Sequence, residues 1–225
     1  MLSPTIIALR MGILAPVAYF GVQLLAAPFY PGYSFLSRDA STLGSEGSSL
    51  PVIFNVGAIV TGVAALVASI GFVTTLRQLR VRAMVASLTA AAVASGGLGA
   101  INAGLYPLPD PRHAGGLLSQ LGFGLFLVPI LMPAAIWRLP RAETMRRYLV
   151  VNGLVLAAMV PVMSGLIQRA AIAAGIELAG YQYFLNNYQG LLQRIVAATV
   201  FLPIGVVAHF LARRMEQDEP RQWPD

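Results

Sequence analysis

The chain has 225 residues, of which 57% are hydrophobic and 11% are charged, and its mean hydropathy is +0.71. Soluble domains carry about 25% charged residues, so this composition excludes an ordinary soluble protein. The net charge of +6 comes from arginine alone, because the chain contains no lysine. It also contains no cysteine. A retinal Schiff base, a P-loop lysine, a disulfide and a thiolate metal site are therefore excluded.

Six apolar runs of about twenty residues follow one another, and each is long enough to cross a bilayer as a helix. Their apolar residues are continuous rather than alternating, which excludes a β-barrel. We predict an all-α integral membrane protein, a six-helix bundle that forms one domain over residues 1–212, with a charged cytoplasmic tail at 213–225. The predicted spans are about 6–28, 51–76, 83–106, 115–137, 149–171 and 191–212.

Taken in order, the first run resembles a signal peptide, but residues 25–27 make a poor cleavage site, and we expect the run to be retained as a span. A polar loop at 30–50 follows, and Pro51 suits the first position of the second span. The third span carries small residues four apart, which allow a neighbouring helix to approach closely: Ala91, Ser95, Gly99 and Ala103. The second and third spans lack internal proline, whereas the first, fourth, fifth and sixth contain prolines that kink helices, namely Pro16, Pro129, Pro133, Pro161 and Pro203. Kinks in several spans favour a cavity between them.

The arginines are distributed unequally between the two sides of the predicted bundle. The smaller set consists of Arg38, Arg112, Arg169 and Arg194, with Asp39, Glu46, Asp110 and Glu177 as nearby counter-charges. The larger set lies at the N-terminus, in the other two connections and in the tail: Arg10, Arg77, Arg80, Arg82, Arg138, Arg141, Arg146, Arg147, Arg213, Arg214 and Arg221. We expect an inner-membrane protein, and the positive-inside rule predicts that both of its termini lie in the cytoplasm. This distribution also explains the basic charge without a nucleic-acid partner.

The outer side collects polar residues that suit a ligand with a polar head. We expect Arg194, Arg169, Asp39, Asn102 and Gln193 to bind it, because charges at the margin of the hydrocarbon usually face the bundle or a wet cavity. The planar fork of arginine suits an anionic group. The alternative is that these arginines pair with loop carboxylates or snorkel, and so fasten the loops to the helix ends.

A catalytic site is a further hypothesis, with Asp110, His113 and Ser41 as its candidates. His113 follows Asp110 by three residues, and such a pair could serve as a general base, with Ser41 as a nucleophile. The other histidine, His209, belongs to the opposite side of the membrane, so the two cannot share one metal ion or haem. We therefore expect no metal site and no cofactor.

Three stretches resemble the bacterial membrane family catalogued as domain of unknown function 998. The first is SRDASTLGSEGSSLPVIFNVGAIVTG, in which the match rests on residues 41–44, Phe54-Asn55, Gly57 and Gly62. The second is the turn YPLPDPRHAGG, with Pro109, Asp110 and His113. The third is GLLQRI, with Gly190, Gln193 and Arg194. The resemblance implies a six-span helical protein. It points to no particular activity, because none is assigned to the family. The pair Asp39-Ala40 departs from the family pattern, which has a more apolar pair there.

Our preferred hypothesis is a protein that binds a membrane lipid or a small amphiphile in a cavity facing the outer leaflet. The alternatives are a membrane-embedded hydrolase or transferase that acts on a lipid-linked substrate, and an accessory subunit that docks to a membrane-protein partner. A transporter is less favoured, because the spans contain few charges at mid-membrane and no inverted repeat.

Overall fold

The computed structural model describes residues 3–176, 178 and 180–218, and these residues form an all-α structure. Six helical stretches among them are long and apolar enough to cross a membrane, which confirms the predicted all-α structure with six candidate spans. The elements are α1 (Pro4–Ala26), η1 (Ala27–Phe29), η2 (Ala40–Gly44), α2 (Pro51–Gln78), α3 (Ala83–Leu105), α4 (Arg112–Gly115), α5 (Leu117–Gly122), η3 (Phe123–Leu127), α6 (Val128–Ile136), α7 (Glu143–Met163), α8 (Leu166–Ala173) and α9 (Tyr181–Asp218).

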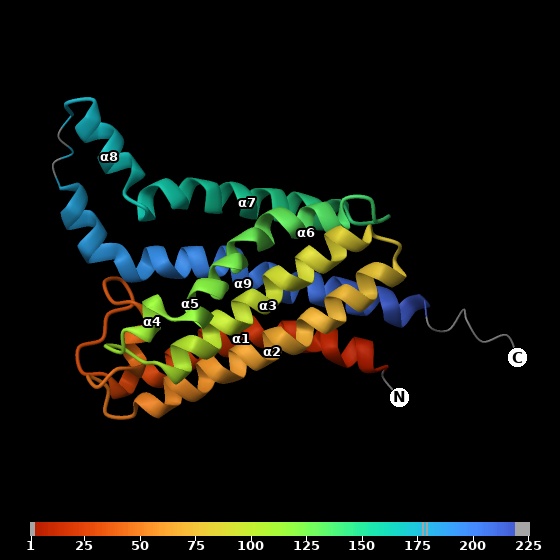
Figure 1. The fold of residues 1–225 in the computed structure, drawn as a ribbon, viewed down its shortest axis with the longest axis horizontal. Helices are drawn as coiled ribbons and strands as arrows, with labels where there is room; N and C mark the ends of the chain where they lie inside the picture. The colour runs from red at the N-terminus through yellow and green to blue at the C-terminus, as the bar shows by residue number, and fades with distance from the viewer. Residues whose placement is uncertain (1–2, 177, 179, 219–225) are drawn as a thin grey trace, which may run out of the picture.

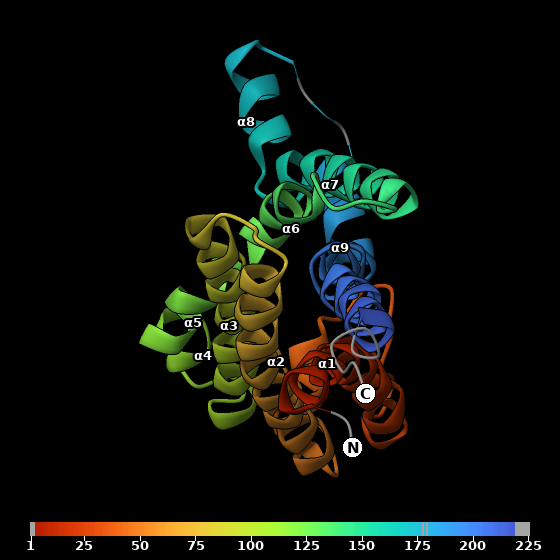
Figure 2. The same ribbon diagram turned by 90° about the vertical axis from the view of Figure 1, so that its right-hand side faces the viewer.

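The long helices α1, α2, α3 and α9 lie side by side along the long axis of the molecule (Figures 1 and 2). The pairs α1–α2 and α2–α3 pack most extensively, and α6 and α7 lie on the other side of α9. In Figure 1, α7 diverges from α9, and α8 projects away from the bundle. The bundle is therefore closely packed around α2 and more open around α7.

The two ends of the bundle carry different connections (Figure 1). What we call the loop end holds the 30–50 loop, α4, and the α8–α9 connection. The terminal end holds the start of α1, the end of α9 and the connections 79–82 and 137–142. Of the charges used above to assign sides, Glu177 and Arg221 lie outside the described residues, as do tail residues 219–225.

Glycine lets the central helices approach backbone to backbone. A Cβ on Gly97 would lie 2.7 Å from the carbonyl oxygen of Gly62, and a Cβ on Gly71 would lie 2.6 Å from the backbone nitrogen of Leu9. At the α1–α9 crossing, a Cβ on Gly12 would lie 2.7 Å from the Cβ of Ala208. In a bilayer, such close van der Waals packing replaces the hydrophobic effect as the force between helices.

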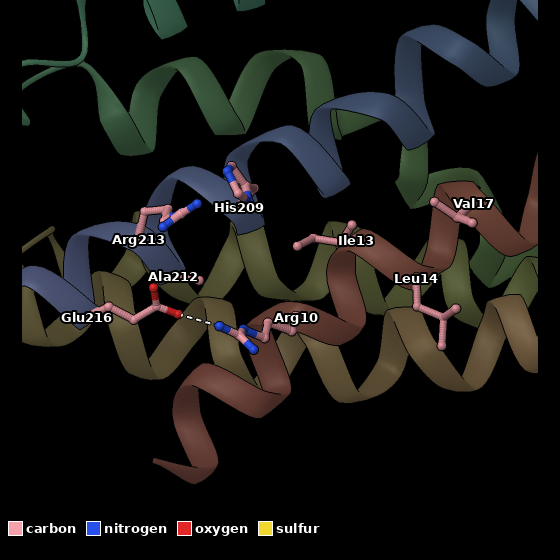
Figure 3. A pocket seen from close by; sticks show the side chains of 8 residues that line it. All are labelled: Arg10, Ile13, Leu14, Val17, His209, Ala212, Arg213 and Glu216. Atoms are coloured by element: carbon pink, nitrogen blue, oxygen red, sulfur yellow. Dashed lines mark hydrogen bonds and ion pairs between the residues drawn. The ribbon is translucent and has the colours of Figure 1, made fainter. Parts of the chain in front are cut away.

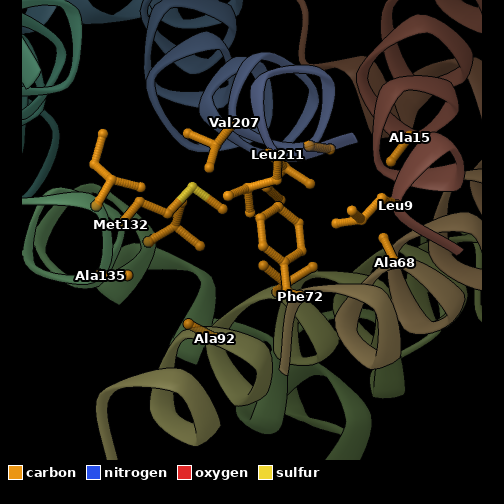
Figure 4. Close-up of a cluster of buried hydrophobic side chains, with 14 of the residues drawn as sticks. Leu9, Ala15, Ala68, Phe72, Ala92, Met132, Ala135, Val207 and Leu211 are labelled. Atoms are coloured by element: carbon orange, nitrogen blue, oxygen red, sulfur yellow. The ribbon is translucent and has the colours of Figure 1, made fainter. Parts of the chain in front are cut away.

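The largest apolar core lies in the half of the bundle nearer the terminal end (Figure 4). Phe72 of α2 is fully buried and points toward Leu211 of α9, with Met132 of α6 and Leu9 of α1 on either side. A smaller core at the loop end packs residues of the 30–50 loop against α1 and α2, and consists of Val22, Ala26, Ala40, Leu43, Phe54 and Ala58. The 30–50 loop is thus part of the folded core.

The predicted fourth span, 115–137, is not one continuous helix. It consists of α5, the 3₁₀ segment η3 and α6. Pro129 lies in the first turn of α6, where its missing N–H needs no partner within the helix, and α6 therefore begins at Val128 instead of continuing α5. Ser95 of α3 donates its hydroxyl to the carbonyl of Leu121, and the backbone of Gly122 lies against Gly99. This irregular segment therefore packs against the stripe of small residues on α3.

The last two predicted spans also have different bounds. The range 149–171 contains a break, because α7 runs from Glu143 to Met163 and α8 begins at Leu166. Gly165 has a φ of 68°, the left-handed conformation that ends many helices. Helix α9 begins at Tyr181 rather than at residue 191, because the polar stretch before Leu191 continues the helix beyond its apolar part.

Candidate functional site

Arg194 of α9 fastens the 30–50 loop to the helix bundle. Its Nη1 atom donates to the carbonyls of Phe35 and Arg38, each at 3.0 Å, and to that of Gly190 at 2.7 Å. Its Nη2 atom donates to the hydroxyl of Tyr33, and the guanidinium carbon lies 4.9 Å from the centroid of the Phe35 ring. One side chain thus binds several groups of a loop that is distant in sequence.

The residues around Arg194 on α9 extend this attachment. The side-chain oxygen of Gln193 accepts from the backbone N–H of Ala40 at 2.8 Å, and Gln189 donates to a carboxylate oxygen of Asp39 at 2.7 Å. The backbone N–H of Leu191 donates to the carbonyl of Leu36 at 2.9 Å. At Gly190, a Cβ would lie 2.8 Å from the carbonyl oxygen of Phe35, so only glycine fits beneath the loop without a shift.

Tyr33 links the two halves of this attachment. Its hydroxyl accepts from Arg194 and donates to the carbonyl of Asp39 at 3.1 Å. Partial burial raises the pKa of Tyr33 above its usual range, with Arg194 acting in the opposite direction. The phenol therefore stays protonated near neutral pH and keeps its donor. Further along the loop, the side-chain amide of Asn55 donates to the carbonyl of Gly44 at 3.2 Å.

The second loop-end connection, 106–116, is held by its own residues and by Asn102. The buried amide of Asn102 donates to the carbonyls of Arg112 and His113, at 3.2 and 2.9 Å. Nδ1 of His113 lies 2.7 Å from the carbonyl of Tyr106, so this nitrogen carries a proton and donates it to that carbonyl. Asp110 binds the backbone and the guanidinium of Arg112, with its closest ion-pair distance at 2.7 Å. That pairing lowers the pKa of Asp110 to about 2.

The catalytic hypothesis required Ser41, Asp110 and His113 to meet. None of the hydrogen bonds among the described residues joins any two of these side chains. Asp110 is committed to Arg112, and a carboxyl group with a pKa of about 2 is a weak general base near neutral pH. Within the described ranges, no group of three or more His, Asp or Glu side chains could hold a metal ion.

A groove with a volume of about 780 Å³ opens between η3, α6, α7 and α9. Its walls are mainly apolar and include Pro129, Ile130, Leu156, Val160, Pro161 and Val196. Ser164 and Gln193 also line it, and both lie toward the loop end of their helices. We call this cavity the loop-end groove. It has the size of small-molecule sites, which range from about 300 to 1,000 Å³.

The predicted ligand-binding residues fall into three places. Gln193 lines the loop-end groove, and Arg169 lies beside it, because its guanidinium donates to the carbonyl of Ser164 at 3.0 Å. Arg194 and Asp39 hold the 30–50 loop, while Asn102 holds the 106–116 connection. Direct contact of these residues with a ligand stays a prediction.

At these positions one buried donor and one buried acceptor lack a hydrogen-bond partner among the described residues. The Nε atom of Arg194 is buried and has no hydrogen-bond partner among the residues described, and the same holds for Oδ1 of Asn102. Sequence reasoning did not find the apolar walls of the loop-end groove. The kinking prolines Pro129 and Pro161, which predict a cavity between the spans, both line it, as does the predicted ligand-binding residue Gln193.

The fold and these contacts define a multi-pass membrane protein with six candidate spans, in which a polar loop is fastened to the last helix. Over residues 13–209 the chain matches the family model described as "Protein of unknown function (DUF998)", and it belongs to that family. The predicted family membership is therefore confirmed. Neither the curated proteins nor the solved structures contain a match to the chain.

Proposed function

We propose that the protein binds a membrane lipid, or a small amphiphile of similar build, in the loop-end groove. The observation that carries this proposal is the division of the groove into apolar walls and a polar end. Membrane lipids have the same division, and a groove flanked by candidate spans is open to them laterally.

The length of the groove fits one leaflet. Its lining residues on α7 extend from Gly153 to Ser164, which are eleven residues apart. At 1.5 Å per residue this is about 16 Å, roughly half of the 30 Å hydrocarbon core. An occupant would place its apolar chain toward mid-membrane and its head at the loop end.

The head would lie between Gln193 on α9 and Arg169 on α8. Arg169 is exposed and makes one hydrogen bond among the described residues, to the Ser164 carbonyl, which leaves most of its donors for an anionic group. Arg194 does not line the groove itself, but it holds the 30–50 loop next to Gln193. Arg169 and Gln193 are thus the main ligand-binding residues in this proposal.

The orientation is part of the proposal. The larger set of arginines lies at the terminal end, and includes Arg10, Arg77, Arg82, Arg138 and Arg147. The positive-inside rule then places the terminal end in the cytoplasm and the loop-end groove in the outer leaflet of the bacterial inner membrane. Because the chain has no cysteine, single cysteines introduced at Ser45 and at Gln78 can be labelled in intact cells with a membrane-impermeant thiol reagent. We expect label at Ser45→Cys alone; label at Gln78→Cys alone would reverse the orientation.

Native mass spectrometry of the purified protein tests occupancy by lipid. Ala157 lines the loop-end groove, whereas its neighbour Ala158 is exposed and lies outside it. We expect Ala157→Trp to fill the groove and to lose co-purifying lipid, and the matched control Ala158→Trp to retain it.

The polar end is tested with Arg169→Gln, for which we expect weaker retention of anionic lipid and unchanged retention of zwitterionic lipid. Equal lipid content in the wild type, Ala157→Trp and Ala158→Trp would overturn the proposal. A thermal unfolding midpoint for each variant shows whether the substitution disturbed the fold.

A further inference from the structure

Two adjoining cavities lie at the terminal end, between α1 and α9. The first, the terminal-end pocket, has a volume of about 570 Å³, and its lining combines apolar residues with the charged residues Arg10, Arg213 and Glu216 (Figure 3). The second, the terminal-end groove, has a volume of about 690 Å³ and is lined mainly by apolar residues, among them Pro16, Phe20, Leu202, Val206 and Phe210. Both cavities share Ile13, Val17, His209 and Arg213, so they form one surface with a polar part and an apolar part.

The terminal-end pocket carries one guanidinium that has no carboxylate partner among the residues that the structure describes. Arg10 forms an ion pair with Glu216 at 2.7 Å, which cancels that pair of charges. Arg213 is exposed and has no hydrogen bond or ion pair with any residue that the structure describes, whereas its neighbour Arg214 donates to the carbonyl of Pro140 at 2.8 Å. His209 lies one helical turn before Arg213, and Figure 3 shows the two side chains next to each other on α9.

The order of polar and apolar parts matches a lipid in the leaflet on the terminal side. Leu202 and Arg213 are eleven residues apart on α9, a rise of about 16 Å, or roughly half of the hydrocarbon core. The charged residues lie toward the helix end, and the apolar lining extends from there toward mid-membrane. An apolar cleft that ends at an exposed guanidinium is complementary to an acyl chain attached to an anionic group.

We propose that this surface binds a phospholipid with a net negative headgroup. The phosphodiester would receive hydrogen bonds from Arg213 and His209, with the Arg10–Glu216 pair as the neighbouring wall of the pocket, and one acyl chain would lie in the terminal-end groove. This site is separate from the loop-end groove: it lies on the opposite half of the bundle and shares none of its lining residues.

The test uses the full-length protein and measures lipid adducts by native mass spectrometry as phosphatidylglycerol or phosphatidylcholine is added. We expect tighter binding of phosphatidylglycerol, and an affinity about fivefold lower in Arg213→Gln, the typical effect of one arginine near a membrane surface. Arg77→Gln is the matched control, since Arg77 is exposed at the same end of the bundle and lies outside both cavities.

The apolar half is tested with a pair of substitutions on α1. Val17 lines both cavities and is 63% exposed, while Ile7 is 52% exposed and lines neither. We expect Val17→Trp to weaken phosphatidylglycerol binding and Ile7→Trp to leave it unchanged. Inorganic phosphate, which has no acyl chain, should not displace the lipid at millimolar concentration.

Three outcomes would overturn the proposal: equal affinity for the two lipids, equal affinity in Arg213→Gln and Arg77→Gln, or displacement of the lipid by phosphate alone. The Ala157→Trp variant of the loop-end groove should leave phosphatidylglycerol binding here intact. The proposals for the two lipid sites can therefore be confirmed or refuted independently of each other.

Discussion

Replacing Arg194 by alanine should release the 30–50 loop from α9. The substitution removes the hydrogen bonds to the carbonyls of Phe35 and Arg38, which join two elements, and the one to Tyr33. Hydrogen bonds to a charged group contribute about 1.5–3 kcal/mol each. Because this region is partly exposed, we take the lower figure for the two carbonyl bonds, which gives about 3 kcal/mol. The local opening equilibrium should then rise about 100-fold.

Hydrogen–deuterium exchange of the protein in nanodiscs measures this opening. The amides of Arg38 and Thr42 are hydrogen-bonded within the loop and report on it directly. We expect them to exchange about 100-fold faster in Arg194→Ala, while amides in α2 and α3 stay protected. Arg38→Ala serves as the control, because the Arg38 guanidinium makes a single exposed hydrogen bond, to Tyr30. Unchanged exchange at Arg38 and Thr42 in Arg194→Ala would show that Gln189, Gln193 and Leu191 hold the loop without Arg194, and would refute the reasoning.

Three further predictions concern helix packing and the second loop. Asn152→Leu removes the 2.6 Å hydrogen bond from α7 to the Thr199 carbonyl of α9, and should lower the free energy of unfolding by about 1 kcal/mol, measured as a lower thermal midpoint; an unchanged midpoint would argue against a structural role. Gly12→Leu forces α1 away from α9 and should cost about 1–3 kcal/mol, whereas Gly21→Leu, which meets nothing within 4 Å, should be tolerated; equal effects would contradict this packing. Asp110 has a pKa lowered to about 2, so its pairing with Arg112 should contribute in full above the usual carboxyl pKa of about 3.9 and be lost as the pH falls toward 2. Exchange protection of residues 106–116, corrected for intrinsic rates, should therefore be equal at pH 7 and pH 5 and lower at both in Asp110→Asn; a loss in the wild type between pH 7 and pH 5 would contradict the lowered pKa.

The number of candidate spans could be predicted from the sequence because each apolar run has the length of a bilayer crossing. The helix bounds were harder to predict from the sequence where backbone geometry, rather than hydropathy, determines them. The left-handed φ of Gly165 ends α7 inside an apolar run, and the helical pattern around Pro129 changes without any change in hydrophobicity.

The candidate site was predictable only as a set of residues on one side. The sequence places Arg194, Gln193 and Asp39 at similar depth, but which of them contacts the protein depends on how the 30–50 loop folds back. The alternative interpretation, in which charged residues fasten loops to helix ends, describes the observed contacts of Arg194 and Asp39. The apolar walls of the loop-end groove carry no pattern of their own, because lipid-facing and cavity-facing residues have the same composition.

The 3₁₀ segment η3 affects how the fourth span matches the thickness of the membrane. A 3₁₀ helix rises about 2.0 Å per residue and an α-helix about 1.5 Å. The five residues of Phe123–Leu127 therefore add about 2.5 Å of contour length to a segment of only 20 residues. Stretching the backbone in this way reduces the hydrophobic mismatch of the shortest span, which otherwise would require local thinning of the bilayer around it.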